Sequence, residues 1–575
     1  MTIMNKFNRR QFLRLGMMGG TLVAGGGLLS GCVMPSGMMN RPRMSVAPAS
    51  PTATTGRAVN RNFAPDLEIN LSATAAQATI LPGAKTTVWR YEASVVKGDP
   101  NSVITLPDNY LGPIIKVRTG QKIRVNMTNN LPSGEAHIVH WHGLHLPEDM
   151  DGHPRYSVAN GKSYVYEFEV KNRAGTYWFH PHTHERTAEQ VMMGLAGLFI
   201  VSDDEEAALG LPSGEFDVPI IIQDRTFDAN NQMVYTAGEG VGMMGRGQQQ
   251  GSAGMMGNNG AGMGGMDMQR MMGFLGERIL INGKPDFVLP AVTRAYRLRL
   301  LNGSNSRIYK LGWSDGMPMT VIATDGGLLE KPAQRDFVML GPGERVEIWA
   351  DFSERKVGET FTLQSLKFEG AESTAMGGMG MGGMMSQGNA PALGAPLTLM
   401  TVRIDKQADA MAKLPTQLSK PNLLRVEDAI NQNAPRQFRL QMRQMNWQIN
   451  GRSFEMDAVA SDEQVKLGTT EVWEFINELN PGEMMEQMGM AHPFHIHGVQ
   501  FNIIERQALP ELKASWDSVR AGFVDDGWKD TFLIMPGERV KVLMRFADYT
   551  GKFVFHCHNL EHEDMGMMRN YEVVA

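Results

Sequence analysis

The sequence predicts an all-β fold made of three related β-sandwich domains. Short alternating runs, such as residues 114–118 and 122–126, are separated by turn residues and indicate strands. A stretch that begins near residue 175 recurs near residue 551, and a third version of its frame lies between them. The chain has 575 residues, which is enough for three domains with large apolar cores.

The internal repeat defines the three domains. The run Gly175-Thr-Tyr-Trp-Phe-His-Pro-His182 matches Gly551-Lys-Phe-Val-Phe-His-Cys-His558. The middle copy, Gly358 to Ser365, has Leu363 and Ser365 where the other two have histidine. Pro342-Gly-Glu-Arg-Val346 likewise matches Pro536-Gly-Glu-Arg-Val540. We therefore expect domains at 70–205, 210–405 and 420–575, of which the middle one has no metal ligands.

The N-terminus has the features of an export signal over residues 1–32, followed by a flexible tether at 33–69. Asn8-Arg-Arg-Gln-Phe-Leu13 resembles a twin-arginine motif, and the apolar stretch after it is too short and glycine-rich for a good membrane span. Leu29-Ser-Gly-Cys32 resembles a bacterial lipoprotein box. We expect an exported protein, either periplasmic or anchored through lipidated Cys32 to a membrane surface facing the periplasm. Ordinary cleavage to a soluble protein is the alternative.

A metal-binding pattern dominates the C-terminus, where His556-Cys557-His558 is followed by His562 and Met567. Side chains alternate along a strand, so the two imidazoles point one way and the thiol points the other. Two His, one Cys and a weak axial Met form the ligand set of a blue-copper centre. Met565 and Met568 are rivals of Met567 for the axial position.

Three more histidine pairs complete the pattern: His140-Trp-His142, His180-Pro-His182 and His495-Ile-His497, with His492 just upstream of the last. Ten of the 14 histidines lie in these four clusters. Eight converging imidazoles suit three copper ions with positions left open for oxygen. The ligands lie towards both ends of the sequence, so the first and third domains must meet.

The four motifs HWHG, GTYWFHPHTH, HPFHIHG and HCHNLEHEDMGMM resemble those of the multicopper oxidases, in particular the bacterial copper-resistance, cuprous-oxidase branch. The resemblance implies cupredoxin-like Greek-key domains and four copper ions. It implies a type 1 copper on His492, Cys557, His562 and Met567, a type 2 copper on His140 and His495, and a type 3 pair on His142, His180, His182, His497, His556 and His558.

The resemblance also implies an activity. Substrate electrons would enter one at a time at the type 1 copper, and dioxygen would be reduced to water at the other three. Glu563 and Asp151 match family positions that supply protons, although either acid is also compatible with a solvated loop.

Methionine is unusually abundant, with 44 in the chain. Nine lie within residues 243–272 of an insert at about 242–272, five lie within 376–385, and four lie within 484–490. Thioethers favour Cu(I), and these lie among Gly, Gln, Asn and Ser rather than in a core pattern. A disordered low-complexity insert is compatible with transient Cu(I) capture. Near the type 1 ligands, Met490, Met488 and Glu486 are candidate substrate-Cu(I) residues, with Met488 replacing an aspartate of the family.

These observations favour a Cu(I) oxidase that serves copper tolerance, with dioxygen as its second substrate. A laccase-like oxidase of phenols or aromatic amines is the nearest alternative, so the reductant is either Cu(I) or a small organic molecule. A non-catalytic periplasmic copper-binding protein is the alternative from another class. The formal charge of −6, without a long charge run, gives no sign of a nucleic-acid partner.

Overall fold

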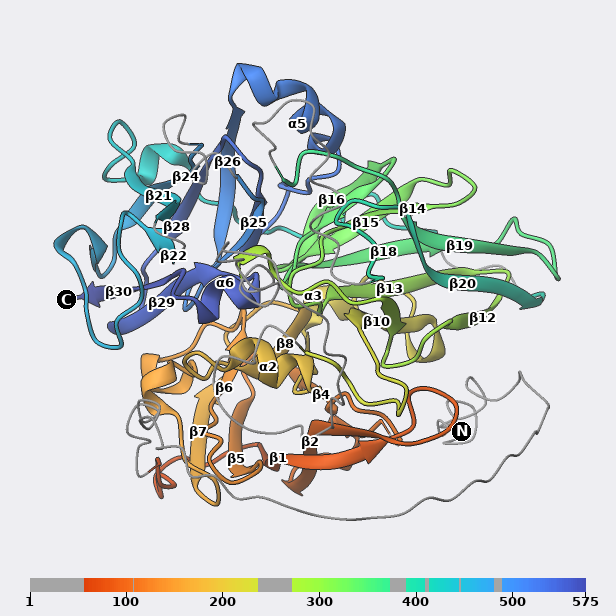
Figure 1. Ribbon diagram of the computed structural model, residues 1–575, viewed down its shortest axis with the longest axis horizontal. Coiled ribbons are helices and arrows are strands. Elements are labelled where there is room, and N and C mark those ends of the chain that lie inside the picture. The colour runs from red at the N-terminus through yellow and green to blue at the C-terminus, as the bar shows by residue number, and fades with distance from the viewer. Residues whose placement is uncertain are drawn as a thin grey trace, which may run out of the picture.

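The computed structural model describes residues 56–106, 108–235, 271–372, 389–408, 413–443, 446–479 and 489–575. Over these residues the chain forms six β-sheets, grouped as two sheets in each of three successive units. Figure 1 shows the first unit in orange at the bottom, the second in green at the right and the third in blue at the upper left. The prediction of an all-β fold with three cupredoxin-like sandwiches is confirmed.

The first unit packs a four-stranded sheet against a five-stranded one. The first sheet has the order β2 (Thr86–Lys97), β1 (Leu67–Ala78), β5 (Lys122–Asn130) and β7 (Ser163–Glu169). The second has the order β3 (Val103–Ile104), β4 (Ile114–Arg118), β9 (Gly197–Ser202), β8 (Gly175–Pro181) and β6 (Val139–His142). Buried side chains from both sheets, including Ile69 of β1 and Trp141 of β6, form one core.

The second unit has a six-stranded and a five-stranded sheet. The larger has the order β11 (Arg278–Ile281), β10 (Asp217–Arg225), β13 (Ala295–Asn302), β18 (Arg345–Asp351), β15 (Met319–Thr324) and β16 (Gly327–Arg335). The smaller has the order β12 (Val288–Val292), β20 (Leu397–Lys406), β19 (Thr360–Ser365), β14 (Tyr309–Trp313) and β17 (Val338–Leu340). Leu363, which replaces a histidine of the repeat, lies in the core of this unit.

The third unit has two five-stranded sheets. One has the order β22 (Asn446–Ile449), β21 (Arg436–Arg443), β24 (Thr470–Asn477), β28 (Glu538–Arg545) and β26 (Phe501–Ala508). The other has the order β23 (Gln464–Lys466), β30 (Met568–Val574), β29 (Gly551–Cys557), β25 (His492–Ile496) and β27 (Thr531–Ile534). Their shared core is rich in aromatic residues and includes Cys557.

Strand pairing repeats the same scheme in each unit. A hairpin strand pairs antiparallel to its neighbour, which pairs parallel to a third strand, and this strand pairs antiparallel to a fourth. In the opposite sheet, β8, β19 and β29 occupy equivalent places next to β6, β14 and β25. The topology therefore agrees with the repeat seen in the sequence and places the histidine pairs of the first and third units on equivalent strands.

Short helices cover the junction of the units: α2 (Thr187–Met192), α3 (Asp204–Ala207), α5 (Lys513–Arg520) and α6 (Leu560–Asp564). Near the centre of Figure 1, α6 of the third unit packs against α2 of the first. Asp564 of α6 accepts hydrogen bonds from the backbone N–H groups of Thr187 and Ala188, at the start of α2. This contact fixes the loop after β29 against the first unit. In the described part of the chain, every helix falls short of the length and apolarity needed to cross a membrane.

Candidate metal centres

The candidate His and Cys ligands lie on four strands, directly after three of these strands, and on one short helix. β6 and β8 of the first unit pair so that His140 lies opposite His180. β25 and β29 of the third unit pair so that His495 lies opposite His556. The structure thus gathers ligands from both units at one interface, where every one of these histidines is buried.

The first centre is built around the Cys557 thiol. Its Sγ lies 3.4 Å from Nδ1 of His492 and 3.6 Å from Nδ1 of His562, and these two nitrogens are 3.3 Å apart. The backbone N–H of Asn559 points to the same sulfur at 3.4 Å. Because all three side chains are buried and converge, they form a compact two-His, one-Cys site of the kind that binds copper.

The three methionines near this site differ in their surroundings. Met567 is fully buried and belongs to the same core cluster as Cys557, and its carbonyl accepts a hydrogen bond from the Cys557 backbone N–H. Met568 packs in a separate cluster with Phe454 and Val554, while Met565 is only half-buried. The packing therefore favours Met567 as the neighbour of the thiol.

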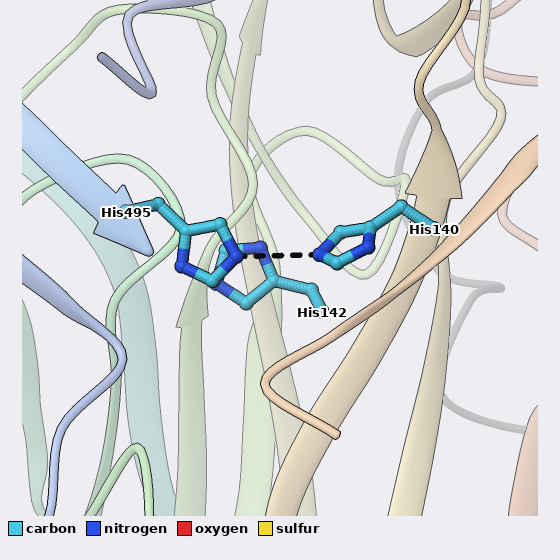
Figure 2. Close-up of side chains that lie close together, drawn as sticks. All are labelled: His140, His142 and His495. Atoms are coloured by element: carbon cyan, nitrogen blue, oxygen red, sulfur yellow. Dashed lines mark hydrogen bonds between the residues drawn. The ribbon is translucent and has the colours of Figure 1, made fainter. Parts of the chain in front are cut away.

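The second centre contains eight histidines in three groups, two of which share His142. One group is His142, His180 and His558, another is His182, His497 and His556, and the third contains His140, His142 and His495. Figure 2 shows the third group, in which the Nε2 atoms of His140 and His495 approach to 3.2 Å across the interface between units. Each group combines side chains from the first and third units.

The outer ring nitrogens of five of these histidines are held by polar oxygen atoms. Nδ1 of His140 lies 2.6 Å from the Asp151 carbonyl, that of His495 2.8 Å from the Asp530 carbonyl, and that of His180 2.8 Å from the Pro181 carbonyl. Nδ1 of His497 lies 2.7 Å from the Asp151 carboxylate, and that of His556 3.1 Å from the Cys557 carbonyl. A proton on Nδ1 leaves the Nε2 lone pair free to face the centre, as in metal-binding histidines.

The protonation state of the rings also suits metal binding. Burial lowers the pKa of His492 and of His180 to about 3, and burial followed by neighbouring imidazoles lowers the pKa of His140 well below its usual value. These rings are neutral near pH 7 and keep a lone pair. His558 is fully buried, yet neither of its ring nitrogens has a hydrogen-bond partner. A buried polar group without a partner lowers the stability of the fold by about 1–3 kcal/mol. A copper ion bound to His558 would supply the missing partner.

Both candidate acids contact histidines of the eight-histidine centre. The Asp151 carboxylate belongs to the first unit and binds His497 of the third, and burial raises its pKa well above the usual range. Glu563, on α6, lies 3.8 Å from Nε2 of His182 and 3.2 Å from Nδ1 of His556. Both acids are buried. Their positions allow each to exchange a proton with the centre.

Two residues that the sequence reasoning missed adjoin the thiol centre. The Trp447 ring lies 4.4 Å from that of His562, centroid to centroid. The Met271 carbonyl accepts a hydrogen bond from Trp447 Nε1 at 3.1 Å and lies 2.9 Å from His562 Nε2. Met271 lies near the end of one methionine-rich run and Trp447 lies in strand β22, but only tertiary packing brings them to His562.

The remaining sequence predictions have different outcomes. Met490 is buried in the core cluster that contains Cys557. Met488, Glu486 and Cys32 lie outside the described residues, as do most of the methionine-rich inserts. The four histidines outside the clusters have other partners. For example, Nδ1 of His137 lies 3.0 Å from Oε1 of Gln190, and Nε2 of His153 lies 2.8 Å from Oδ1 of Asn570.

Comparisons with known proteins agree with this geometry. Two family models, each described as multicopper oxidase, match residues 87–206 and 429–575. The chain is 30% identical over 477 residues to the multicopper oxidase mco of Staphylococcus aureus, covering 83% of this chain and 85% of that protein. It is 29% identical to a laccase of Bacillus subtilis, covering 80% and 88%. The crystal structure of the McoA multicopper oxidase of Aquifex aeolicus matches with a TM-score of 0.69 and 30% identity, covering 89% of this chain and 97% of that one.

The buried imidazoles predict acid sensitivity of the copper-free protein. Burial lowers the pKa of His180 and His492 to about 3 and of His137 and His153 to about 4. Below the unfolded-state pKa of about 6.5 the unfolded chain binds more protons, so stability falls as pH falls. Each such histidine contributes a slope of up to about 1.4 kcal/mol per pH unit, and the raised pKa of Asp151 opposes only a part of this.

We expect the melting temperature of the copper-free protein to fall steadily from about pH 7 to about pH 5. His153→Asn, at a histidine outside the copper clusters, should make the unfolding free energy less dependent on pH, by the equivalent of about one proton taken up on unfolding. A melting temperature that is flat or rises on acidification would contradict neutral burial of these rings.

Proposed function

The chain belongs to the multicopper oxidase family, and from that premise we propose that it oxidises Cu(I) and reduces dioxygen to water, in the service of copper tolerance. Enzymes of this family use copper, dioxygen and a reducing substrate. Four bound coppers and Cu(I) as the reductant are the specific parts of the proposal. The observation that carries the choice of Cu(I) is that described residues at the ends of three methionine-rich segments lie beside the ligands of the Cys557 centre.

We assign the ligands as follows. Cys557, His492 and His562, with Met567 as axial ligand, would hold the type 1 copper. His140 and His495 would hold the type 2 copper. The type 3 pair would divide between the groups His142, His180, His558 and His182, His497, His556, and the grouping of the side chains supports this division.

Copper in these sites supplies the redox chemistry: four one-electron oxidations of substrate, and transfer of four electrons to dioxygen to give two waters. The protein connects the two centres by the shortest covalent route. Cys557 is bonded through the backbone to His556 and His558, which lie in different histidine groups. The buried carboxyl groups of Asp151 and Glu563 adjoin the histidines and would deliver the protons that water formation needs.

The first methionine-rich segment is attached beside the type 1 ligands. Its two ends are joined by Glu561, the residue before His562. The Glu561 carboxylate accepts hydrogen bonds from the Tyr235 hydroxyl at 3.0 Å, on one side of the insert, and from the Phe274 N–H at 3.0 Å, on the other. Met271, within the run, lies at His562. The described residues on the two sides of the insert therefore meet beside His562.

The residues just before the second segment lie beside the end of the third segment, next to His492. Glu372, just before the second segment, forms a β-bridge with Met490, the last residue of the third. The backbone N–H of Ala491 also donates to the Ala371 carbonyl at 2.7 Å. Three segments that are distant in the sequence thus have their anchoring points at one site. Met271 and Met490, at two of these points, lie in the same core cluster as Cys557, and their soft thioethers support Cu(I) as substrate.

A laccase-like oxidation of phenols or aromatic amines is the second candidate. Its support is the similarity to a laccase of Bacillus subtilis, which covers 80% of this chain. Both candidates use the same copper centres, so they differ only in what approaches His492 and His562.

Replacing the thiol tests the type 1 assignment. Cys557→Ser should abolish the blue colour and the oxidase activity, because the thiolate is the source of the strong charge transfer. The other three coppers should largely remain, since their ligands are unchanged. The measurements are absorption, copper per chain and oxygen uptake. A Ser variant that is colourless but still active would refute the assignment.

Removing one sulfur separates the two substrates. Met490→Leu keeps volume and apolarity, so we expect kcat/KM for Cu(I) to fall, on the order of tenfold for about 1.4 kcal/mol of lost interaction. Oxidation of a phenol should not change. Met127→Leu, at a fully buried methionine of the first unit, is the matched control. Equal losses for Cu(I) and phenol, or no loss for Cu(I), would make the laccase-like function the better proposal.

We also propose that the enzyme acts outside the cytoplasm, anchored through lipidated Cys32. The support is the sequence Leu29-Ser-Gly-Cys32 after the twin-arginine-like motif. Cys32→Ala should move the protein from the membrane fraction to the soluble periplasmic fraction, while Cys557→Ala should leave it on the membrane. An unaltered protein found wholly in the soluble fraction would show that the anchor does not exist.

A further inference from the structure

The middle unit reaches the eight-histidine centre although its described residues contribute no member of the ligand groups. The turn before β18, Pro342-Gly343, packs directly on the centre. A Cβ at Gly343 would lie 3.0 Å from the His558 ring and 3.2 Å from that of His142. The next residue but one, Arg345, is completely buried. This turn is therefore one wall of the candidate cluster.

Arg345 joins all three units at this wall. Its Nη1 and Nη2 atoms donate to the two carboxylate oxygens of Asp530, in the third unit, at 2.7 and 2.6 Å. Its Nε donates to the Thr176 carbonyl of β8, in the first unit, at 2.9 Å. Within the second unit, Asp325 accepts the Arg345 backbone N–H at 2.7 Å. The guanidinium therefore holds Asp530 in one orientation through a two-point contact.

Asp530 in turn contacts a ligand. Its Oδ1 lies 3.0 Å from Nε2 of His142, and the Thr531 hydroxyl donates to the same oxygen at 2.9 Å. The orientation of His142 is therefore opposite to that of His140 and His495: its Nδ1 faces inward, 3.3 Å from Nε2 of His180. A carboxylate at Nε2 places the proton there and leaves the Nδ1 lone pair for the cluster.

The internal repeat allows Arg345 to be compared with Arg539, the arginine at the equivalent position of the third unit. Pro536-Gly537-Glu538-Arg539 of the third unit forms the same turn, in which Glu538 accepts a backbone N–H at 2.7 Å, as Glu344 does in the second unit. Arg539, however, is exposed, and its nearest acid, Glu474, is 3.8 Å away. Turn geometry thus requires the glutamate but not a buried arginine.

We infer that Arg345 is a positioning residue for the candidate copper cluster: it fixes the Asp530 carboxylate, which selects the tautomer and orientation of His142. The ligand-free middle unit thereby sets the geometry of a site formed by the other two. The inference rests on the proposed function only in that the eight histidines bind copper, and it is independent of whether the substrate is Cu(I) or a phenol.

The test compares two buried arginines, each of which donates two hydrogen bonds to one carboxylate. Arg345→Lys keeps the positive charge but loses the paired hydrogen bonds to the two carboxylate oxygens of Asp530. Arg299→Lys loses an equivalent pair of hydrogen bonds to Asp217, whose partners include no histidine, and Arg299 likewise contacts Thr176. Each protein is loaded with copper and challenged with a chelator. Retained copper, the electron paramagnetic resonance spectrum and the melting temperature of the copper-free form are measured.

For Arg345→Lys we expect the blue type 1 signal to persist and the cluster to lose copper affinity by roughly 10- to 100-fold, with an altered type 2 spectrum. Arg299→Lys should lower the melting temperature while keeping wild-type copper retention. If both variants retain cluster copper like the wild type, or lose it equally, Arg345 has no positioning role.

Asp530→Asn provides a test that does not depend on the stability of one variant. If Arg345 acts through Asp530, the variant that combines Arg345→Lys with Asp530→Asn should retain as much cluster copper as Asp530→Asn alone. Additive losses would overturn the inference. Failure of the wild-type protein to load the cluster would instead refute the proposed function, because that result does not involve Arg345.

Discussion

The structure depends on the alternation of side chains along β29 and the residue that follows it. Cys557 points into the aromatic core of the third unit, while His556 and His558 point across the interface to the first unit. One short segment thus belongs to two centres at once. The position of the thiol fixes where His492 and His562 must converge, and the flanking imidazoles fix where the first unit must dock.

Docking of the units forms a site that neither unit contains alone. β6 and β8 supply or adjoin four histidines, and β25 and β29 supply or adjoin the other four. The acids Asp151 and Glu563 each reach towards a ligand of the opposite unit. The middle unit contributes Arg345, whose buried pairing with Asp530 spans the junction. Removal of one partner of such a pair typically costs about 3–5 kcal/mol, so ligand geometry and cohesion of the units are linked.

Much of this arrangement could be predicted from sequence because the ligands occur in short motifs on strands. His140, His180, His495 and Cys557 were identified by their spacing, and the repeat indicated a ligand-free middle domain whose Leu363 lies in a core. Met271, Trp447, Asp530 and Arg345 were not identified, since their contacts join residues far apart in the chain. The repeat of Pro-Gly-Glu-Arg contained a signal for Arg345, but burial distinguishes it from Arg539 only in three dimensions.

The central claim is that ten histidines and Cys557, from two units, together with Met567, hold four coppers in two centres. The most direct measurement is copper per chain in the purified, copper-loaded protein, combined with electron paramagnetic resonance of the same sample. The account predicts four coppers, of which two give a resonance signal, one type 1 and one type 2, while the coupled pair is silent. A protein that is correctly folded and copper-saturated but binds only one or two coppers would contradict it.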